Sequence, residues 1–356
     1  MGTPISELVF RRPLDWSEIS NRKIGIDTHN TLYQFLSNIR SVDGSPLMNS
    51  KGRVTSHLTG LLYRTAGLVE HGVKPVFVFD GKPLALKSRV LDARREVRTN
   101  AKEKFERAKA IGDLAEARKF ASQSSSVTPE IVESAKELLQ LLGFPVVQAP
   151  SDGEAQIAFM VANGDVFAGV SQDYDALLFG CERVIRNLAF AGKRKVPGRN
   201  VFVDVEPELV ELDVVLRRLE IDRPKLVWLG ILVGTDFNEK FPKIGPKTAL
   251  KIVQANNSFE EIVKYTGFKP EFDPEEIAKI FLEPAHTDKY HIEFSLPNKE
   301  KVKKFLVDEH DFSEERVNNV LNKLEQKLGE RGEQSRLFDW NAKPSANKTN
   351  SKKTKK

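Results

Sequence analysis

The chain has 356 residues, of which 40% are hydrophobic, enough to build one large α/β domain or two smaller ones. It contains a single cysteine, Cys181, which excludes an internal disulfide and a cysteine-based zinc site. The sequence has no apolar run of about 18 residues, and its start, MGTPISELVF, lacks the regions of a signal peptide. We therefore expect an intracellular protein without a membrane span.

The net charge is +5, with a pI near 9.0, and its distribution is uneven. Residues 87–119 carry 11 Lys and Arg against 6 Asp and Glu, and residues 341–356 carry 6 Lys and no acid. The remainder of the chain is acidic, with 38 basic and 44 acidic residues. Basic charge gathered in two segments suggests a polyanionic partner, although a solvated charged helix is the alternative for 87–119.

Four apolar runs predict strands, each followed by a helix. They lie in KIGID (23–27), KPVFVF (74–79), FPVVQ (144–148) and DVFAGV (165–170). The continuous apolar run of the second is typical of a strand that is buried on both faces. Strands that alternate with helices predict an α/β fold, a mostly parallel twisted sheet flanked by helices.

A charged insertion separates the second and third strands, over about 84–127. It is rich in Ala, Lys, Arg and Glu, which are good helix formers, and its apolar residues are sparse. A helix that is polar nearly all round does not bury a full face, so we expect helices that project from the sheet as an arch and become ordered with a partner. Thr128, Pro129 and Gly143 then mark the start and end of an amphipathic helix.

The strand pattern fades after residue 235, and the chain is mostly helical to 328. From 329 the composition shifts toward Ser, Asn, Lys and Pro, which predicts a flexible tail over 329–356. The rest, 1–328, is expected to form one domain. It comprises an N-terminal region (about 1–100), the arch (about 84–127), an internal region (about 128–260) and a helical C-terminal region.

Carboxylates follow every predicted strand, and another follows the apolar run KLVWLGILVG. Ligands bind beyond the carboxyl ends of strands in open α/β sheets, so these acids should meet in space. A single Asp after a strand is more often a helix N-cap, but the full set with a basic insertion points to a site. A site with only oxygen ligands suits Mg²⁺ or Mn²⁺. The negative charges of so many acids are balanced better by two ions than by one, and two ions are the arrangement used for in-line displacement at phosphorus. The seven acids are Asp27, Asp80, Asp152, Glu154, Asp173, Asp175 and Asp236.

Six segments carry a family resemblance. They are MGTPISELV, IGIDTHNTLYQFL, VFVFDGKP, APSDGEAQIA, SQDYDALLFG and VGTDFNEKFPKIGPKTALKIV. In this order they resemble the flap endonuclease branch of the structure-specific 5′ nucleases, closest to the archaeal members, over about 1–328. The resemblance implies a two-metal phosphodiesterase of DNA replication and repair. Such an enzyme cuts 5′ flaps near single-strand/double-strand junctions and has 5′–3′ exonuclease activity.

Two alternatives stay open: a junction- or bubble-cutting nuclease of the same family, and a non-catalytic DNA-junction binder. The resemblance also implies two Mg²⁺ ions, with Mn²⁺ able to substitute, and branched DNA with a 5′ flap as substrate. We expect a monomer that does not bind membranes, cytoplasmic and nucleoid-associated if the source is archaeal.

The seven acids fall on the metal-site carboxylates of the family, with one departure. Where the family usually has Glu, this chain has Asp152, which keeps the charge on a shorter side chain. Lys87 and Arg94 match the basic residues that hold the scissile phosphate diester; two exposed surface charges are the alternative.

Other residues match DNA contacts of the family. Tyr33 matches an aromatic on which a base stacks, although a core tyrosine is the alternative. Gly2 matches the N-terminal glycine near the metals.

KIGPKTALKI resembles a helix–two-turn–helix element, in which Gly245 and Lys247 would contact duplex phosphates at a helix N-terminus. The tail segment QSRLFDW resembles the short motif that docks on the replication sliding clamp. It lacks the second of the two usual adjacent aromatics, and a segment that folds back on the body is the alternative. The residues that match this motif are Gln334, Leu337, Phe338 and Trp340.

Overall fold

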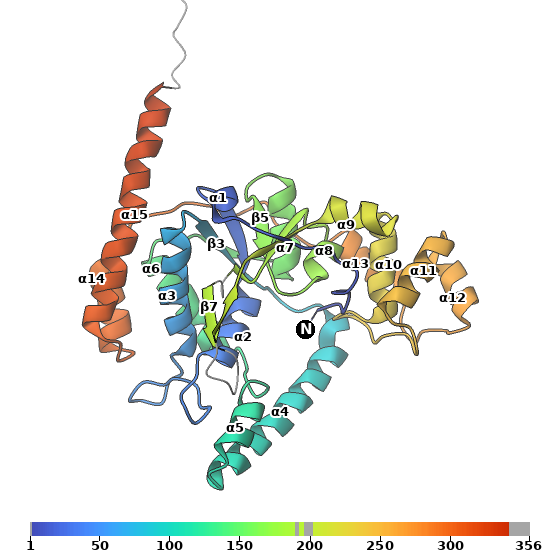
Figure 1. The fold of residues 1–356 in the computed structure, drawn as a ribbon, viewed down its shortest axis with the longest axis horizontal. Coiled ribbons are helices and arrows are strands. Elements are labelled where there is room, and N and C mark those ends of the chain that lie inside the picture. Colours follow the sequence, from blue (N-terminus) through green and yellow to red (C-terminus); the bar gives the residue numbers. More distant parts are fainter. Residues whose placement is uncertain (1, 189–191, 196–201, 342–356) are drawn as a thin grey trace, which may run out of the picture.

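The structure is a computed structural model that describes residues 2–188, 192–195 and 202–341. Its centre is a seven-stranded sheet in the order β1-β9-β6-β5-β2-β3-β4 (Figure 1). The five strands from β6 to β4 are parallel, and β9 and β1 are added antiparallel at one edge. The mostly parallel sheet is therefore confirmed. Its strands are β1 (Arg12–Pro13), β2 (Lys23–Asp27), β3 (Lys74–Phe79), β4 (Val146–Gln148), β5 (Ala168–Val170), β6 (Arg183–Arg186) and β9 (Glu208–Glu211).

Both faces of the sheet are buried, as the apolar run of β3 predicted. Val76 and Val78 point into one core, and Phe77 and Phe79 point into the other, because successive side chains of a strand face opposite sides. The first core is covered by α7 (Gly153–Ala162), α8 (Asp175–Leu178), α9 (Leu212–Leu219) and α10 (Arg223–Val233). The second is covered by α2 (Thr28–Asn38), α3 (Ser56–Glu70), α6 (Pro129–Leu141), α14 (Lys299–Lys303), η3 (Lys304–Asp308) and α15 (Glu314–Asn341).

Close packing fixes α7 on the sheet. A Cβ at Gly169 of β5 would lie 2.5 Å from the Cγ2 of Ile157 on this helix. A glycine here lets the helix approach the strand directly, so the start of α7 is held near the carboxyl ends of β3 and β5. The predicted limits of α6 are also confirmed: Thr128 is its N-cap, Pro129 its first residue, and Gly143 follows it with φ +83°.

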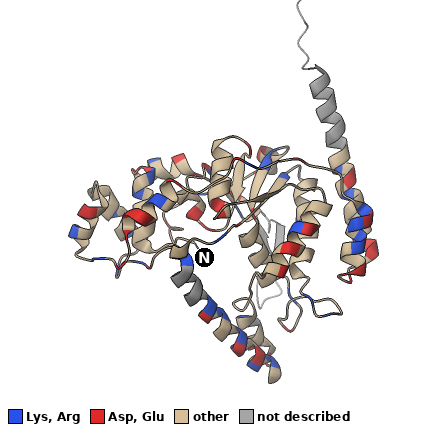
Figure 2. Ribbon diagram, turned by 180° about the vertical axis from the view of Figure 1, so that it is seen from behind, with Lys and Arg blue, Asp and Glu red and all other residues tan. Residues whose placement is uncertain are grey.

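The insertion forms a projecting arch (Figure 1) of η1 (Ala85–Lys87), α4 (Ser88–Ala110) and α5 (Leu114–Ala121). The two helices pack on each other through a small core of their own, made by Phe105, Ala108, Ala117 and Ala121. Their described outer surface carries both signs of charge (Figure 2). The projecting insertion is confirmed, and its ordering by a partner stays a prediction.

The chain after residue 235 is mostly helical, as predicted. Short helices α11 (Pro246–Ala255), α12 (Phe259–Thr266) and α13 (Pro274–Leu282) follow α10. Residues 283–298 then run to α14 with no regular helix or strand. Two small elements complete the described chain: α1 (Trp16–Ile19), near the N-terminus, and a separate hairpin of β7 (Gly192–Lys195) and β8 (Phe202–Val205).

The predicted tail, 329–356, starts inside α15, which continues to Asn341, and its flexibility stays a prediction. Residues 330–341 include Glu, Arg, Gln and Leu, which are good helix formers and carry the helix past Gly329. Residues 342–356 lie outside the described residues. Within residues 2–188, 192–195 and 202–341, none of the helices is long and apolar enough to cross a membrane.

Candidate active site

A cavity of about 1250 Å³ lies where the parallel strands end, at the base of the arch. Asp27 ends β2, Asp80 follows β3, and Asp173 lies between β5 and α8. The predicted gathering of acids is thus confirmed for most of the set. Asp175, two residues after Asp173, is buried and does not line the cavity. Six of the seven line the cavity: Asp27, Asp80, Asp152, Glu154, Asp173 and Asp236.

Asp27 is both a helix cap and a member of the acidic cluster. Its side chain accepts a hydrogen bond from the Asn30 N–H at 3.1 Å as the N-cap of α2. Burial, followed by the nearby Asp80 charge, raises the pKa of Asp27 well above its ordinary value. Asp80 is held by the Gly153 N–H, which donates to its Oδ1 at 2.8 Å. Asp27 is therefore the N-cap of α2 and a member of the acidic cluster at the same time.

Asp173 and Asp175 are held by donors that lie far away in the sequence. The Gly2 N–H donates to Asp173 at 2.8 Å, and the Asn30 side-chain amide donates to its other oxygen at 2.8 Å. The Thr3 N–H donates to Asp175 at 2.7 Å, and the Thr3 hydroxyl donates to the same oxygen. Burial, then the Asp236 charge, raises the pKa of Asp175 to about 6 despite these bonds.

Gly2 lies so close to Asp173 that it has no room for a side chain. A Cβ at this position would stand 2.6 Å from the Asp173 Cβ. The N-terminal segment is therefore packed against the carboxylates, as expected for Gly2 from the resemblance.

Lys87 is the cation closest to the acids among the described residues. Its ammonium forms an ion pair with Asp152 and lies 4.9 Å from the centre of the Phe237 ring. Burial lowers the pKa of Lys87, but the Asp152 charge and its hydrogen bond outweigh this and raise it overall. Burial raises the pKa of Asp152, and Lys87 only partly offsets this. Lys87 is thus a partly buried, paired cation and not a free surface charge.

Glu154 lies in the first turn of α7. It accepts a hydrogen bond from the Ser171 hydroxyl at 2.6 Å. Burial, then the Asp27 charge, raises the pKa of Glu154 well above its ordinary value. Holding several buried carboxylates together costs free energy unless cations or protons neutralise them.

The donor set fits divalent cations. All seven candidates offer carboxylate oxygens, the ligands that Mg²⁺ and Mn²⁺ prefer, and the shared cavity would bring ions and substrate together. In the described part of the chain, no group of three or more His, Cys, Asp or Glu side chains forms a ready-made metal site. The acids are instead held by N–H and O–H donors and by Lys87.

The remaining predicted residues lie in four places. Tyr33 lines the cavity with 40% of its surface exposed, so it is not a core tyrosine. Arg94 lies within α4, but its side chain is not described. Gly245 caps α11 and, like Lys247, is absent from the cavity lining. The Lys247 ammonium is exposed and lies 3.4 Å from Glu7. Gln334, Leu337, Phe338 and Trp340 lie on α15 with side chains outside the described residues.

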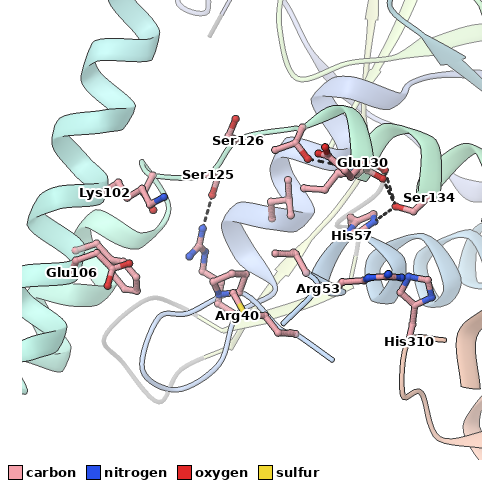
Figure 3. A pocket seen from close by; sticks show the side chains of 18 residues that line it. Arg40, Arg53, His57, Lys102, Glu106, Ser125, Ser126, Glu130, Ser134 and His310 are labelled. Carbon is pink, nitrogen blue, oxygen red and sulfur yellow. Dashed lines mark hydrogen bonds between the residues drawn. The ribbon is translucent and has the colours of Figure 1, made fainter. Parts of the chain in front are cut away.

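A second cavity, of about 850 Å³, was not predicted from the sequence (Figure 3). It lies between α6, the arch and the loop that joins α2 to α3. Arg40 crosses it to donate to the Ser125 hydroxyl at 2.6 Å, and His57 Nε2 lies 2.8 Å from the Ser134 hydroxyl. Burial, then the neighbouring His310, lowers the pKa of His57 to about 3. None of the predicted site residues lines this cavity.

Several residues of the first site were missed by sequence reasoning. Thr3, Asn30 and Ser171 hold carboxylates through hydrogen bonds, and only Asn30 has a local signal, three residues after a capping Asp. His29 also lies beside Asp80, with its Nδ1 3.6 Å from an Asp80 oxygen. These contacts join segments that the sequence pattern leaves unrelated.

A parallel α/β sheet with acids gathered at its strand ends, under a projecting charged arch, defines the class of metal-dependent nucleases. Comparison with known families agrees. The XPG N-terminal domain model matches residues 4–101, and the XPG I-region model matches residues 143–236.

Similar proteins identify the family. The chain is 50% identical over 341 residues to flap endonuclease 1 of Pyrococcus abyssi, covering 96% of this chain and 98% of that protein. It is 50% identical over 340 residues to flap endonuclease 1 of Methanosarcina acetivorans, covering 96% and 100%. The structure of flap endonuclease-1 from Methanococcus jannaschii superimposes with a TM-score of 0.73 at 40% identity, covering 93% of this chain and all of that one. This chain belongs to the flap endonuclease family of structure-specific 5′ nucleases.

A more distant structure shares the fold alone. The catalytic core of Rad2 in complex with DNA substrate superimposes with a TM-score of 0.64 at 19% identity, covering 90% of this chain and 97% of that one.

Proposed function

We propose that this chain hydrolyses one phosphodiester of branched DNA at the base of a 5′ flap, with the help of two divalent metal ions. The observation that carries the proposal is the cavity at the strand ends, which six acids line together with Lys87 and Tyr33. Family membership supports the substrate class. A 5′–3′ exonuclease activity would use the same site on a recessed 5′ end.

The seven carboxylates would hold the metal ions, and Mg²⁺ is the expected ion, with Mn²⁺ able to replace it. Bound there, such ions lower the pKa of an attacking water and neutralise charge on the transferring phosphoryl oxygens. The chain's own groups supply the frame: Gly2, Thr3 and Asn30 orient Asp173 and Asp175. Asp152 is the shorter acid at its position, and its carboxylate reaches Lys87.

Lys87 is placed to bind the scissile phosphate. Its side chain is partly buried at the arch base and its ammonium already pairs with Asp152, so it can exchange part of this pairing for a phosphate oxygen. Arg94, farther along the same helical run, would add a second cation. Tyr33 also lines the cavity and offers an exposed ring on which a base can stack.

The duplex would bind at the start of α11, away from the cavity. A Cβ at Gly245 would meet nothing within 4 Å, so nothing in the described protein requires glycine there. Open space at the N-terminus of a ten-residue helix favours the approach of a phosphate, and Lys247 is exposed beside it. Such contacts position the duplex without reading its bases.

The end of α15 and the tail would tether the enzyme to the replication sliding clamp. The motif residues Gln334, Leu337, Phe338 and Trp340 follow all of the site residues in the chain. A clamp contact would therefore raise local concentration without altering the site.

A labelled 5′-flap substrate tests the function. Wild-type protein should cut near the junction with Mg²⁺ and not with EDTA, and should cut bubbles and four-way junctions more slowly. Asp173→Asn should lower cleavage by several orders of magnitude while the affinity for DNA in Ca²⁺ changes little. Asp213→Asn is the matched control, because Asp213 is exposed and pairs only with Arg217 in the described structure.

Two results would contradict the proposal. Binding of flaps without any Mg²⁺-dependent cleavage would support a non-catalytic junction binder. Faster cleavage of bubbles or four-way junctions than of flaps would support a junction- or bubble-cutting nuclease of the same family.

A further inference from the structure

We infer that Arg186 of β6, acting through Tyr174, is a positioning residue for the carboxylates Asp173 and Asp175. This inference rests on the proposed function of these acids as metal ligands. Tyr174 is the residue between them, and it is buried, with 5% of its surface exposed.

Arg186 contacts the residue before Asp173 and the residue after it, in the loop that carries this acid. Its Nη1 donates to the Tyr174 hydroxyl at 2.5 Å, and its Nη2 donates to the Gln172 carbonyl at 3.2 Å. Its guanidinium carbon also lies 4.5 Å from the centre of the Tyr174 ring. One side chain thereby fixes the residue before Asp173 and the residue after it.

The same tyrosine also contacts the N-terminal segment that binds the two acids. The Tyr174 hydroxyl donates to the Ser6 hydroxyl at 3.3 Å and accepts from Arg11 at 3.3 Å. Both distances are long for hydrogen bonds of these kinds, so the Arg186 bond is the strongest of the three. Gly2 and Thr3 of this segment donate to the two acids. Tyr174 therefore contacts both the loop that carries the acids and the segment that donates to them.

Arg186 acts at a distance from the reacting atoms. It does not line the acidic cavity, and none of its hydrogen bonds in the described structure reaches a carboxylate. Its Nε is buried and has no hydrogen-bond partner among the described residues. The contacts to Tyr174 and Gln172 therefore account for the placement of Arg186. Burying its Nε without a hydrogen-bond partner costs free energy, which argues that the position of this side chain is required.

The expected consequence is loss of alignment and not loss of binding. A shift of the loop by about 1 Å would misplace two ligands at once, and misplacement on this scale costs about 100-fold in rate. The contacts that bind duplex and flap lie on other elements and should be retained.

The test compares Arg186→Met, Arg186→Lys and Tyr174→Phe with Arg183→Met in the full chain. Arg183 is the matched control, since it lies on the same strand but donates to the Phe167 carbonyl and stacks on that ring. Four quantities are measured: single-turnover flap cleavage against Mg²⁺ concentration, flap affinity in Ca²⁺, Mn²⁺ binding by electron paramagnetic resonance, and melting temperature.

We expect Arg186→Met to lower maximal cleavage 10- to 100-fold and to weaken Mn²⁺ binding about tenfold. Flap affinity should stay within twofold, and Arg183→Met should leave cleavage and Mn²⁺ binding unchanged. Arg186→Lys should recover part of the loss, because an ammonium can reach the hydroxyl but not the carbonyl as well. The double variant Arg186→Met/Tyr174→Phe should be no slower than the slower single variant.

Three outcomes would overturn the inference. The first is a cleavage defect that follows flap affinity alone, which would make Arg186 a DNA contact. The second is Mn²⁺ binding equal to wild type in both Arg186→Met and Tyr174→Phe. The third is additive losses in the double variant. If Arg186→Met does not fold, Tyr174→Phe and Arg186→Lys decide. If wild type cuts no flap but Arg186→Met still weakens Mn²⁺ binding, the proposed function fails and the positioning role stands.

Discussion

Replacing Gly2 by Ala should disable the site without disturbing the fold. The added Cβ would lie 2.6 Å from the Asp173 Cβ, 3.1 Å from its Cγ and 3.2 Å from the Asp175 Cγ. Carbon atoms in contact stand about 3.5–4.0 Å apart, so the segment or the loop must move by about 1 Å. That movement would stretch the 2.8 Å bond from the Gly2 N–H to Asp173. A misplacement of this size costs about 100-fold in rate, or about 2.7 kcal/mol in activation free energy.

The assay is single-turnover cleavage of a labelled flap at saturating Mg²⁺, with flap affinity measured separately in Ca²⁺. Gly67→Ala is the control, because a Cβ at this position in α3 meets nothing within 4 Å. The control should cleave at the wild-type rate and be slightly more stable, since Ala is the better helix former. Cleavage by Gly2→Ala within twofold of wild type would refute the steric argument.

Three further predictions concern charge, duplex binding and the tail. Asp175→Asn should raise the free energy of unfolding in EDTA at pH 8 by up to about 3 kcal/mol, because the folded pKa of about 6 lies above the ordinary 3.8. Ionisation of Asp175 lowers the free energy of unfolding once the pH exceeds the ordinary pKa, and the full cost is reached above the folded pKa. In denaturant titrations, the stability gained by Asp175→Asn should therefore fade as the pH falls from 6 to 4. Lys247→Glu should weaken duplex affinity severalfold at low salt, reduce the salt dependence of binding, and leave single-turnover cleavage at saturating enzyme unchanged. Trp340→Ala should abolish most stimulation by the clamp and leave unstimulated cleavage within a few-fold of wild type. Tight clamp binding by Trp340→Ala would show that this residue is not the anchor.

Local sequence patterns predicted the centre of the sheet and the position of its acids. β2 ends at Asp27, and β3 is followed directly by Asp80. Such apolar runs are recognisable because both faces are buried. Once these strands are parallel, their carboxyl ends share one edge, so Asp27 and Asp80 meet regardless of their distance in the chain. The resemblance added Lys87 and Gly2 as candidate site residues, which no pattern of spacing indicates.

Other elements could not be predicted, because they depend on contacts distant in sequence. β6 (RVIR) and β9 (ELVE) are short, have charged ends and pair with each other across 22 to 28 residues. The bond from Thr3 to Asp175 joins residues 172 apart. The arch core was missed because alanines build most of it, and small residues give little periodic signal.

The site gathers groups that oppose folding and depends on the rest of the fold to hold them. Burial and like charge raise the pKa of Asp27, Glu154 and Asp175, so the ionised cluster costs free energy in the folded state. The donors that offset this cost include groups of the N-terminal segment, of α2 and of the arch base, three separate parts of the chain. Lys87 is the N-cap residue of α4 as well as the partner of Asp152. A displacement of the arch base therefore moves a positive charge relative to the acids, which couples the position of the arch to the electrostatics of the site.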